Sequence, residues 1–226
     1  MSLKDVCILI CIIFLALVGC SSPKSSHRTV NDHMYVDLKL PSGTLWSTCN
    51  IGANNPWEIG NHFLWGETKP IEEKKSSGYL WGQRGNYIKY GEVDNKMILD
   101  KEDDAASVLW GGKWRMPTNE ELEELKKYCF CLTVRNYKRT GIGGQIFISK
   151  RNGKKIFLPV DGLFGNYWTA SLYQSYQSNQ SDCVHYHHFV SKIHFERGEA
   201  RTYPIQFTCR FREVRCLIRP VMSKDK

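Results

Sequence analysis

The sequence predicts a single α+β domain built mainly from antiparallel strands. Segments with strand-like alternation lie toward both ends of the chain, and helical patterns lie in the middle. An Asn152-Gly153 pair also separates two apolar runs, which is a strong β-hairpin signal. We expect long irregular loops to connect these elements.

The first half of the chain contains short expected strands and one long loop. Strands are expected at residues 35–40, 45–49 and 62–66, where apolar and polar residues alternate or β-forming residues gather. Residues 68–99 are rich in Gly, Lys, Tyr and Asn and show little hydrophobic periodicity. A loop of this length in a compact domain is usually functional or mobile, so binding residues are first expected there.

Two helices are expected in the middle of the chain. Residues 100–110 predict a short helix. A longer helix begins after Thr118, because Glu121 three residues later completes a capping box. Leu122, Leu125 and Cys129 then recur on one face, which predicts a buried stripe.

The second half is rich in expected strands. Residues 145–149 and 155–159 form the predicted hairpin, and residues 167–171 predict a central strand. Alternating apolar residues at 205–211 and 214–218 predict the last two strands.

The N-terminus is typical of an exported lipoprotein. An apolar run of about 13 residues, 6–18, is too short to span a membrane and fits the core of a signal peptide. It ends in Leu17-Val18-Gly19-Cys20, which resembles a lipobox and predicts a fatty acyl anchor such as palmitate on Cys20. An ordinary signal peptide and an uncleaved anchor helix are the weaker alternatives. Ser21 after the cysteine favours the outer membrane and leaves open whether the domain faces the periplasm or the exterior.

Domain limits follow from this interpretation. We expect a signal peptide at residues 1–19, a lipidated cysteine with a flexible polar tether at 20–33, one domain at 34–222 and a tail at 223–226. The net charge of +8 favours anionic partners or a generic solvated surface, while the export signal argues against a nucleic acid.

Six cysteines remain after the signal and the lipid site are set aside: Cys49, Cys129, Cys131, Cys183, Cys209 and Cys216. An even number in an oxidising compartment is compatible with three disulfides, and roughly 15 pairings are possible. Composition does not choose among them, and buried free thiols are the alternative.

Ordered motifs along the chain resemble the Fibrobacter succinogenes major paralogous (FISUMP) domain family. The similar text includes residues 36–46, 49–53, 63–68, 103–106, 110–118, 156–159, 167–171 and 218–221. The resemblance implies a C-type-lectin-like fold and no defined activity. By the same analogy it implies a disulfide from Cys129 or Cys131 to Cys209 or Cys216. Arg215, Cys216 and the long His-rich stretch at 174–194 depart from the family pattern.

Catalytic and metal chemistry are weakly supported. Cys183, His185, His187, His188 and His194 lie in one segment, but no carboxylate or distant cysteine pair is obviously coupled to them, so no metal is predicted. Calcium-dependent sugar-binding triplets and nucleophile motifs are absent. Asp103 and Asp104 are expected to cap or brace residues 113–115. We therefore predict a protein that is not an enzyme and has no cofactor.

Aromatic residues supply the candidate ligand site. Trp46, Trp65, Trp110, Trp114 and Trp168 lie in regular elements and are expected in the core. Tyr79, Trp81, Tyr87 and Tyr90 lie in the long loop near Arg84 and Lys89, where rings and basic groups suit a sugar or a protein. Because the loop shows little hydrophobic periodicity, we expect these rings to contribute little to stability.

The sequence thus favours a non-catalytic envelope lipoprotein, attached to a membrane by lipid, whose lectin-like domain binds an unknown protein or glycan. The alternatives are an outer-membrane accessory protein that binds polysaccharide directly and an enzyme with an unrecognised acid–base pair.

Overall fold

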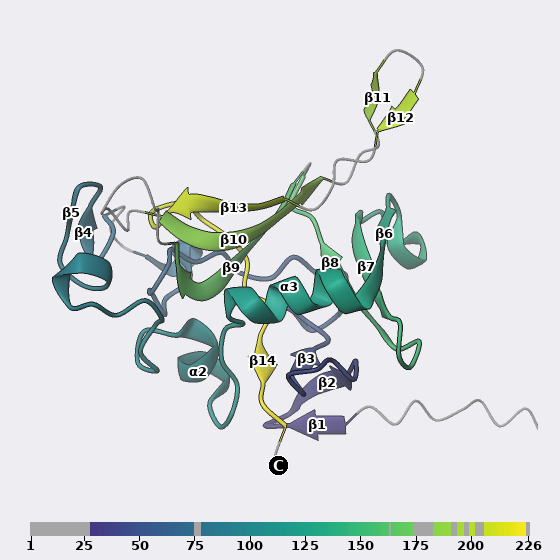
Figure 1. Ribbon diagram of the computed structural model, residues 1–226, viewed down its shortest axis with the longest axis horizontal. Coiled ribbons are helices and arrows are strands. Elements are labelled where there is room, and N and C mark those ends of the chain that lie inside the picture. The colour runs from purple at the N-terminus through teal and green to yellow at the C-terminus, as the bar shows by residue number, and fades with distance from the viewer. Residues whose placement is uncertain are drawn as a thin grey trace, which may run out of the picture.

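Antiparallel sheets carry most of the regular structure, which confirms the α+β fold with long irregular loops (Figure 1). The computed structural model describes residues 28–74, 78–162, 164–173, 183–190, 194–196, 199–201 and 206–224. The expected signal peptide and Cys20 lie outside these residues. Within them, neither α2 nor α3 has the length and apolar character of a transmembrane span.

One sheet joins the beginning and the end of the domain. Its four strands lie in the order β1 (Arg28–Val30), β2 (His33–Asp37), β3 (Leu45–Ser47) and β14 (Val221–Met222). The indole N–H of Trp114 also donates to the carbonyl of Val30 at 3.0 Å. Strand β1 thus pairs with β2 and contacts Trp114, although the domain was expected to begin at residue 34.

Both helices begin at a capping side chain, and α2 begins at Ala105, five residues later than expected. Asp104 precedes α2 (Ala105–Trp110), accepts the amide of Ser107 at 2.9 Å and also accepts the amide of Met116 at 2.8 Å. Thr118 and Glu121 form the predicted capping box of α3 (Asn119–Tyr128). The helix ends one residue earlier than its apolar stripe suggested, because Cys129 already has extended backbone angles.

A second sheet packs against α3. It contains β6 (Cys129–Val134), β7 (Gly144–Ser149) and β8 (Lys155–Pro159), and the predicted hairpin joins β7 to β8. Gly153 has a φ of 68° in the turn, where glycine carries no steric penalty. Leu122 and Leu125 of α3 lie in one buried cluster with Phe147 and Ile156.

The third sheet is formed by β9 (Phe164–Leu172), β10 (Cys183–Val190) and β13 (Gln206–Phe211), in the order β13-β10-β9. Single bridges from Ile98 and Leu217 reach β9. Residues 62–66 and 214–218 were expected as full strands, but they meet through a bridge between Phe63 and Cys216. Their backbone groups bond to several different loops, which is why no longer ladder forms.

Short elements complete the described chain. The long loop contains β4 (Gly82–Gln83), β5 (Asn86–Tyr87) and the 3-10 helices η1 (Ile71–Glu73) and η2 (Gly91–Val93). A further 3-10 helix, η3 (Tyr137–Arg139), follows β6, and β11 (His194–Glu196) pairs with β12 (Glu199–Arg201).

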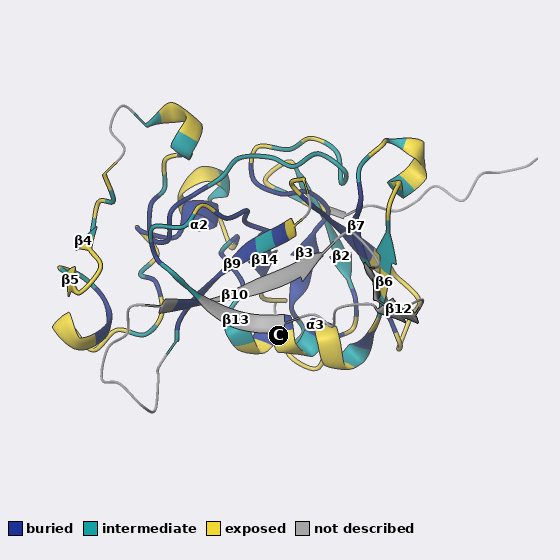
Figure 2. Ribbon diagram, turned by 90° about the horizontal axis from the view of Figure 1, so that it is seen from above, coloured by how far each residue is buried: buried dark blue, intermediate teal, exposed yellow. Residues whose placement is uncertain are grey.

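Buried side chains form two main clusters. In the ribbon of Figure 2 the buried residues are dark blue and include most of β9. Trp46 lies in the cluster beneath α3, while Trp65 and Trp168 lie in the cluster beneath β9. Trp114 is also fully buried, and Trp110 is half-buried with its ring stacked on His33 at 3.6 Å. The prediction that these five tryptophans pack in the core is confirmed for four and holds in part for Trp110.

The cysteines do not pair as the resemblance implied. Among the described side chains, Cys49, Cys129, Cys131 and Cys216 are free thiols, so the link from Cys129 or Cys131 to the last strands is absent. Cys129 lies in the cluster beneath α3 and Cys216 in the cluster beneath β9, and this separation explains why they do not meet. The side chains of Cys183 and Cys209 lie outside the described residues.

Candidate functional site

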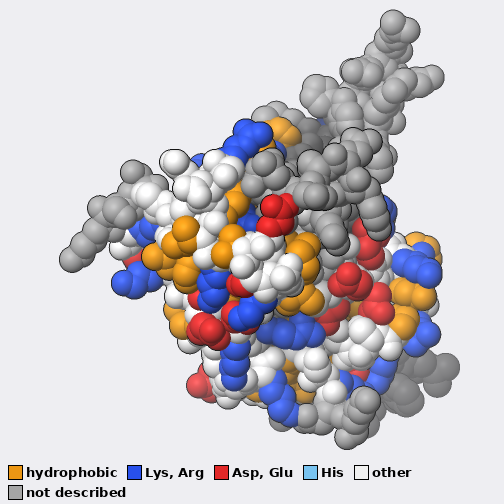
Figure 3. Space-filling view, turned by 60° about the vertical axis from the view of Figure 1, so that its left-hand side comes forward, with side chains coloured by type: hydrophobic (Ala, Val, Ile, Leu, Met, Phe, Trp, Pro, Cys, Tyr) orange, Lys and Arg blue, Asp and Glu red, His pale blue; other side chains and the backbone are white. Residues whose placement is uncertain are grey.

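The predicted ligand residues lie at the end of the molecule formed by β4, β5 and η2 (Figure 1). The hairpin is very short, and the amide of Ile88 extends it by donating to the carbonyl of Trp81 at 3.0 Å. Figure 3 brings this end forward and shows hydrophobic, basic and acidic side chains intermingled on it. We call residues 78–99 the aromatic loop.

The polar tips of the aromatic residues point into the protein. The hydroxyl of Tyr79 donates to the carbonyl of Trp65 at 2.7 Å, and the indole N–H of Trp81 donates to the carbonyl of Gly66 at 2.9 Å. The hydroxyl of Tyr87 donates to Oε1 of Glu213 at 2.8 Å. These three rings thus anchor the aromatic loop on neighbouring segments, and burial raises the pKa of the Tyr79 phenol, which keeps it a donor.

Tyr90 is not a surface residue. It is 1% exposed, packs edge-on against Trp65 at 5.2 Å and donates its hydroxyl to Asp103. Burial and this hydrogen bond raise the pKa of Tyr90. Tyr90 therefore lies in the core, and its role as a ligand contact stays a prediction.

Two basic side chains complete the anchoring. The guanidinium of Arg212 is buried, donates to the carbonyl of Lys89 at 2.7 Å and lies 4.1 Å from the ring centre of Tyr87. The ammonium of Lys89 lies 4.9 Å from the ring centre of Trp81 and pairs with Asp103. The hydrogen bond to Asp103 raises the pKa of Lys89, so this charge is held beside the Trp81 ring.

The exposed apolar groups of the aromatic loop are aliphatic. Leu80, Ile88, Val93 and Ile98 are 62%, 63%, 56% and 52% exposed. Leu80 adjoins Trp81, and Ile88 lies opposite Trp81 across the hairpin. We call these four residues the aliphatic surface. Sequence reasoning missed it, because isolated aliphatic residues in a loop without periodicity give no sign of their exposure.

Sequence reasoning also missed the residues that hold the loop. Arg212 and Glu213 lie more than a hundred positions after Tyr87, and nothing local links them to it. Arg84 was named only as a basic neighbour, and its guanidinium lies 3.8 Å from the ring centre of Phe211.

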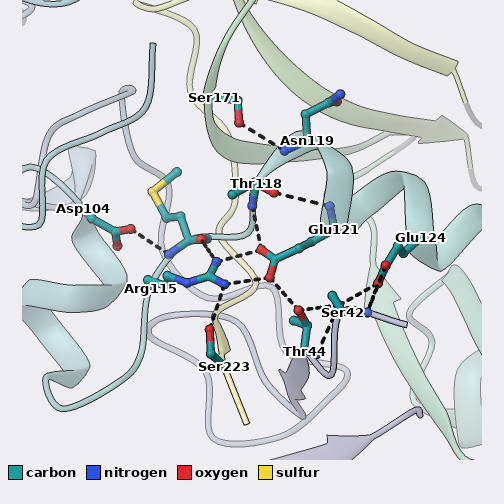
Figure 4. A network of polar contacts seen from close by, with 11 residues as sticks. Ser42, Thr44, Asp104, Arg115, Thr118, Asn119, Glu121, Glu124, Ser171 and Ser223 are labelled. Atoms are coloured by element: carbon teal, nitrogen blue, oxygen red, sulfur yellow. Dashed lines mark hydrogen bonds and ion pairs between the residues drawn. The ribbon is translucent and has the colours of Figure 1, made fainter. Parts of the chain in front are cut away.

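Outside the aromatic loop, charged and polar side chains form a buried network at the start of α3 (Figure 4). Arg115 donates to both carboxylate oxygens of Glu121, at 2.7 and 2.6 Å. Thr44 and the amide of Thr118 donate to the same carboxylate at 2.5 and 2.9 Å. Since both oxygens are occupied, Glu121 has a structural role that joins α3 to the first sheet.

His62 resembles a catalytic histidine more closely than any other described residue. Its Nδ1 lies 3.1 Å from Glu72 and its Nε2 lies 3.2 Å from Asp161. Both ring nitrogens thus lie within hydrogen-bonding distance of a carboxylate. The group was missed because Asp161 is distant in sequence.

No cluster of three or more metal-binding side chains occurs among the described residues. The backbone of β10 places His185 opposite Cys209 and His187 opposite Phe207. The side chains of the His-rich segment, including Cys183, His188 and His194, lie outside the described residues.

No family model, no curated protein and no solved structure matches this chain. The FISUMP resemblance therefore stays a prediction that rests on the sequence motifs.

Proposed function

We propose that this protein is an exported lipoprotein, attached to the outer membrane through Cys20, whose aromatic loop binds a protein partner. The FISUMP assignment and its C-type-lectin-like fold belong to the same proposal. The observation that carries it is the aliphatic surface, displayed on a loop whose aromatic rings are tied to the core.

The chemistry of the loop favours a protein over a glycan. Sugars are recognised by exposed ring faces and by polar groups with free hydrogen-bonding capacity. Here the polar tips of Tyr79, Trp81 and Tyr87 bond to the protein itself. Leu80, Ile88, Val93 and Ile98 offer only apolar area, which is the contribution expected at the centre of a protein interface.

The anchor would keep β1, and with it the domain, close to the membrane. Because β1 begins at Arg28, residues 21–27 separate it from Cys20. Seven residues span at most about 25 Å when fully extended. Partners within the same envelope layer are thus favoured over distant ones.

Glycan binding is the second candidate, because Trp81 is only half-buried and Lys89 lies beside its ring.

A photo-reactive amino acid at Ile88 of the full-length protein, activated in intact cells, tests the proposal. We expect a discrete product of higher mass that glycosidases leave unchanged. The control is the same probe at Lys154, which is exposed on the β7–β8 turn. A product equally strong from Lys154, or one removed by glycosidases, would count against a protein partner at this loop.

A further inference from the structure

Strand β6 forms an unprotected edge at the other end of the molecule from the aromatic loop (Figure 1). It is the terminal strand of the sheet β6-β7-β8, and no described strand pairs with its outer side. Proteins usually shield such edges with charges, proline or a bulge. The six residues Cys129–Val134 contain no charge, no proline and no glycine, and their pairing with β7 has no bulge.

The hydrogen bonds identify which backbone groups face outward. The amide of Lys150 donates to the carbonyl of Tyr128, which places that carbonyl on the β7 side. The amide of Cys129 instead donates to the carbonyl of Leu125 in α3. Because backbone groups alternate sides along a strand, Cys131 and Thr133 direct their N–H and C=O groups to the outer edge.

The side chains on the solvent face of β6 are large and apolar. Phe130 and Leu132 are 60% and 50% exposed and lie opposite Ile148 and Ile146 of β7. An apolar face beside an open backbone edge is the combination that strand addition uses.

We propose that two copies of this chain pair through β6, in antiparallel orientation about a two-fold axis at Leu132. In this register Cys131 of one copy faces Thr133 of the other, so the four outward-facing groups of each copy form four hydrogen bonds in all. Leu132 then meets its own counterpart, and Phe130 meets Val134. The result is a continuous six-stranded sheet with apolar side chains along the junction.

The absence of charged residues on β6 makes a second copy of this chain a suitable partner for this edge. In a two-fold contact each charged group near the axis meets its own like charge, which opposes association. β6 carries no charged residue, so self-pairing brings no repulsion between the two strands. This inference uses a different surface from the proposed function and does not depend on it.

The register predicts which engineered cysteine forms a disulfide between copies. Leu132 and its counterpart would form a pair without direct hydrogen bonds, with Cα atoms about 4.5 Å apart, which a disulfide can bridge. Phe130 is equally exposed and lies on the same face, but the offset of four residues separates it from its counterpart by about 13 Å. Leu132→Cys and Phe130→Cys are therefore a matched pair.

The experiment uses the full-length protein in detergent. Mild oxidation should convert Leu132→Cys to a linked dimer, with little product from Phe130→Cys or from the wild-type chain treated in parallel. Equal cross-linking of the two variants, or none in either, would overturn the proposed pairing.

A second pair of variants tests the backbone edge. Thr133→Pro removes an outward N–H and should shift the mass measured by light scattering from dimer to monomer, while Thr133→Val keeps the N–H and should remain dimeric. If Thr133→Pro also lowers Tm strongly, loss of the dimer could result from unfolding. The cross-linking of Leu132→Cys compared with Phe130→Cys then decides whether the strands pair. A monomeric wild-type chain would refute the proposal.

Discussion

Arg219 shows how a single buried residue connects the sheets. It is 1% exposed, and its guanidinium donates to the side chain of Asn50 and to the carbonyls of Ser47 and Phe157 at 2.8–3.1 Å. Burial lowers the pKa of Arg219. A planar group with several donors fits three separated acceptors, which a lysine ammonium on a single stem does not.

Replacing Arg219 by Met should therefore be costly. Three buried acceptors would lose their donors, and we expect a loss of about 3 kcal/mol or more in the free energy of unfolding, measured by urea denaturation. Arg215→Met is the control, since Arg215 is exposed four residues earlier, and its effect should stay within about 0.5 kcal/mol. Equal effects of the two substitutions would contradict the role assigned to Arg219.

The lowered pKa of Glu121 predicts that the stability of the fold depends on pH. Burial alone would raise its pKa, but the hydrogen bonds and positive charge of Arg115, with the hydrogen bonds from Thr44 and Thr118, lower the pKa below its ordinary value of 4.5. A carboxyl whose folded pKa is lowered stabilises the fold above its unfolded pKa and loses that contribution as pH falls through the folded pKa.

The Tm difference between the wild-type chain and Glu121→Gln should therefore be large at pH 7 and shrink below about pH 4.5. Glu120→Gln is the control at an exposed neighbouring position. A Tm difference for Glu121→Gln that stays constant from pH 7 to pH 3 would show that the carboxylate charge contributes nothing.

At the scale of elements, local patterns predicted well wherever a capping or turn residue marked a boundary. Thr118 with Glu121 located the start of α3, and Asn152-Gly153 located the β7–β8 turn. Segments without such markers were predicted less well. The bridge between Phe63 and Cys216 depends on contacts between distant parts of the chain, so its extent has no local signal.

The aromatic loop gives the clearest limit of sequence reasoning. Composition singled out its residues as ligand candidates, but the direction of their side chains was not predictable, because the anchors Arg212, Glu213 and Asp103 are remote in sequence. The expectation that these rings contribute little to stability conflicts with their hydrogen bonds to the core. The burial of each ring, and not the composition of the loop, sets how much that ring contributes to stability.

Trp81→Ala combined with Tyr87→Ala should therefore lower Tm. Each ring is half-buried and loses an anchoring hydrogen bond, so a total loss of about 2 kcal/mol and a fall in Tm of about 4–8 °C are expected. Differential scanning calorimetry measures it, with Leu80→Ala and Ile88→Ala as the exposed control. An unchanged Tm in the double aromatic variant would instead support the expectation that these rings contribute little to stability.

At the scale of the whole molecule, the proposed anchor and the proposed binding surface make separate predictions. Cys20→Ser should abolish incorporation of labelled palmitate and leave an unprocessed or soluble protein, because the thiol is the expected acceptor. Fractionation of cells detects the change in location. Labelling that persists in Cys20→Ser would refute the lipoprotein assignment.

The central claim is that the aliphatic surface binds a protein partner. Because its side chains differ from those that anchor the loop, the two roles can be tested separately. A photo-reactive residue at Val93 reports contact with a partner, while Leu80→Ser with Ile88→Ser removes apolar area and leaves the hydrogen bonds of Trp81 and Tyr87 in place. We expect this double substitution to abolish the cross-linked protein product while Tm changes by no more than a few degrees. An undiminished product in the double variant would contradict the claim that the aliphatic surface binds the partner.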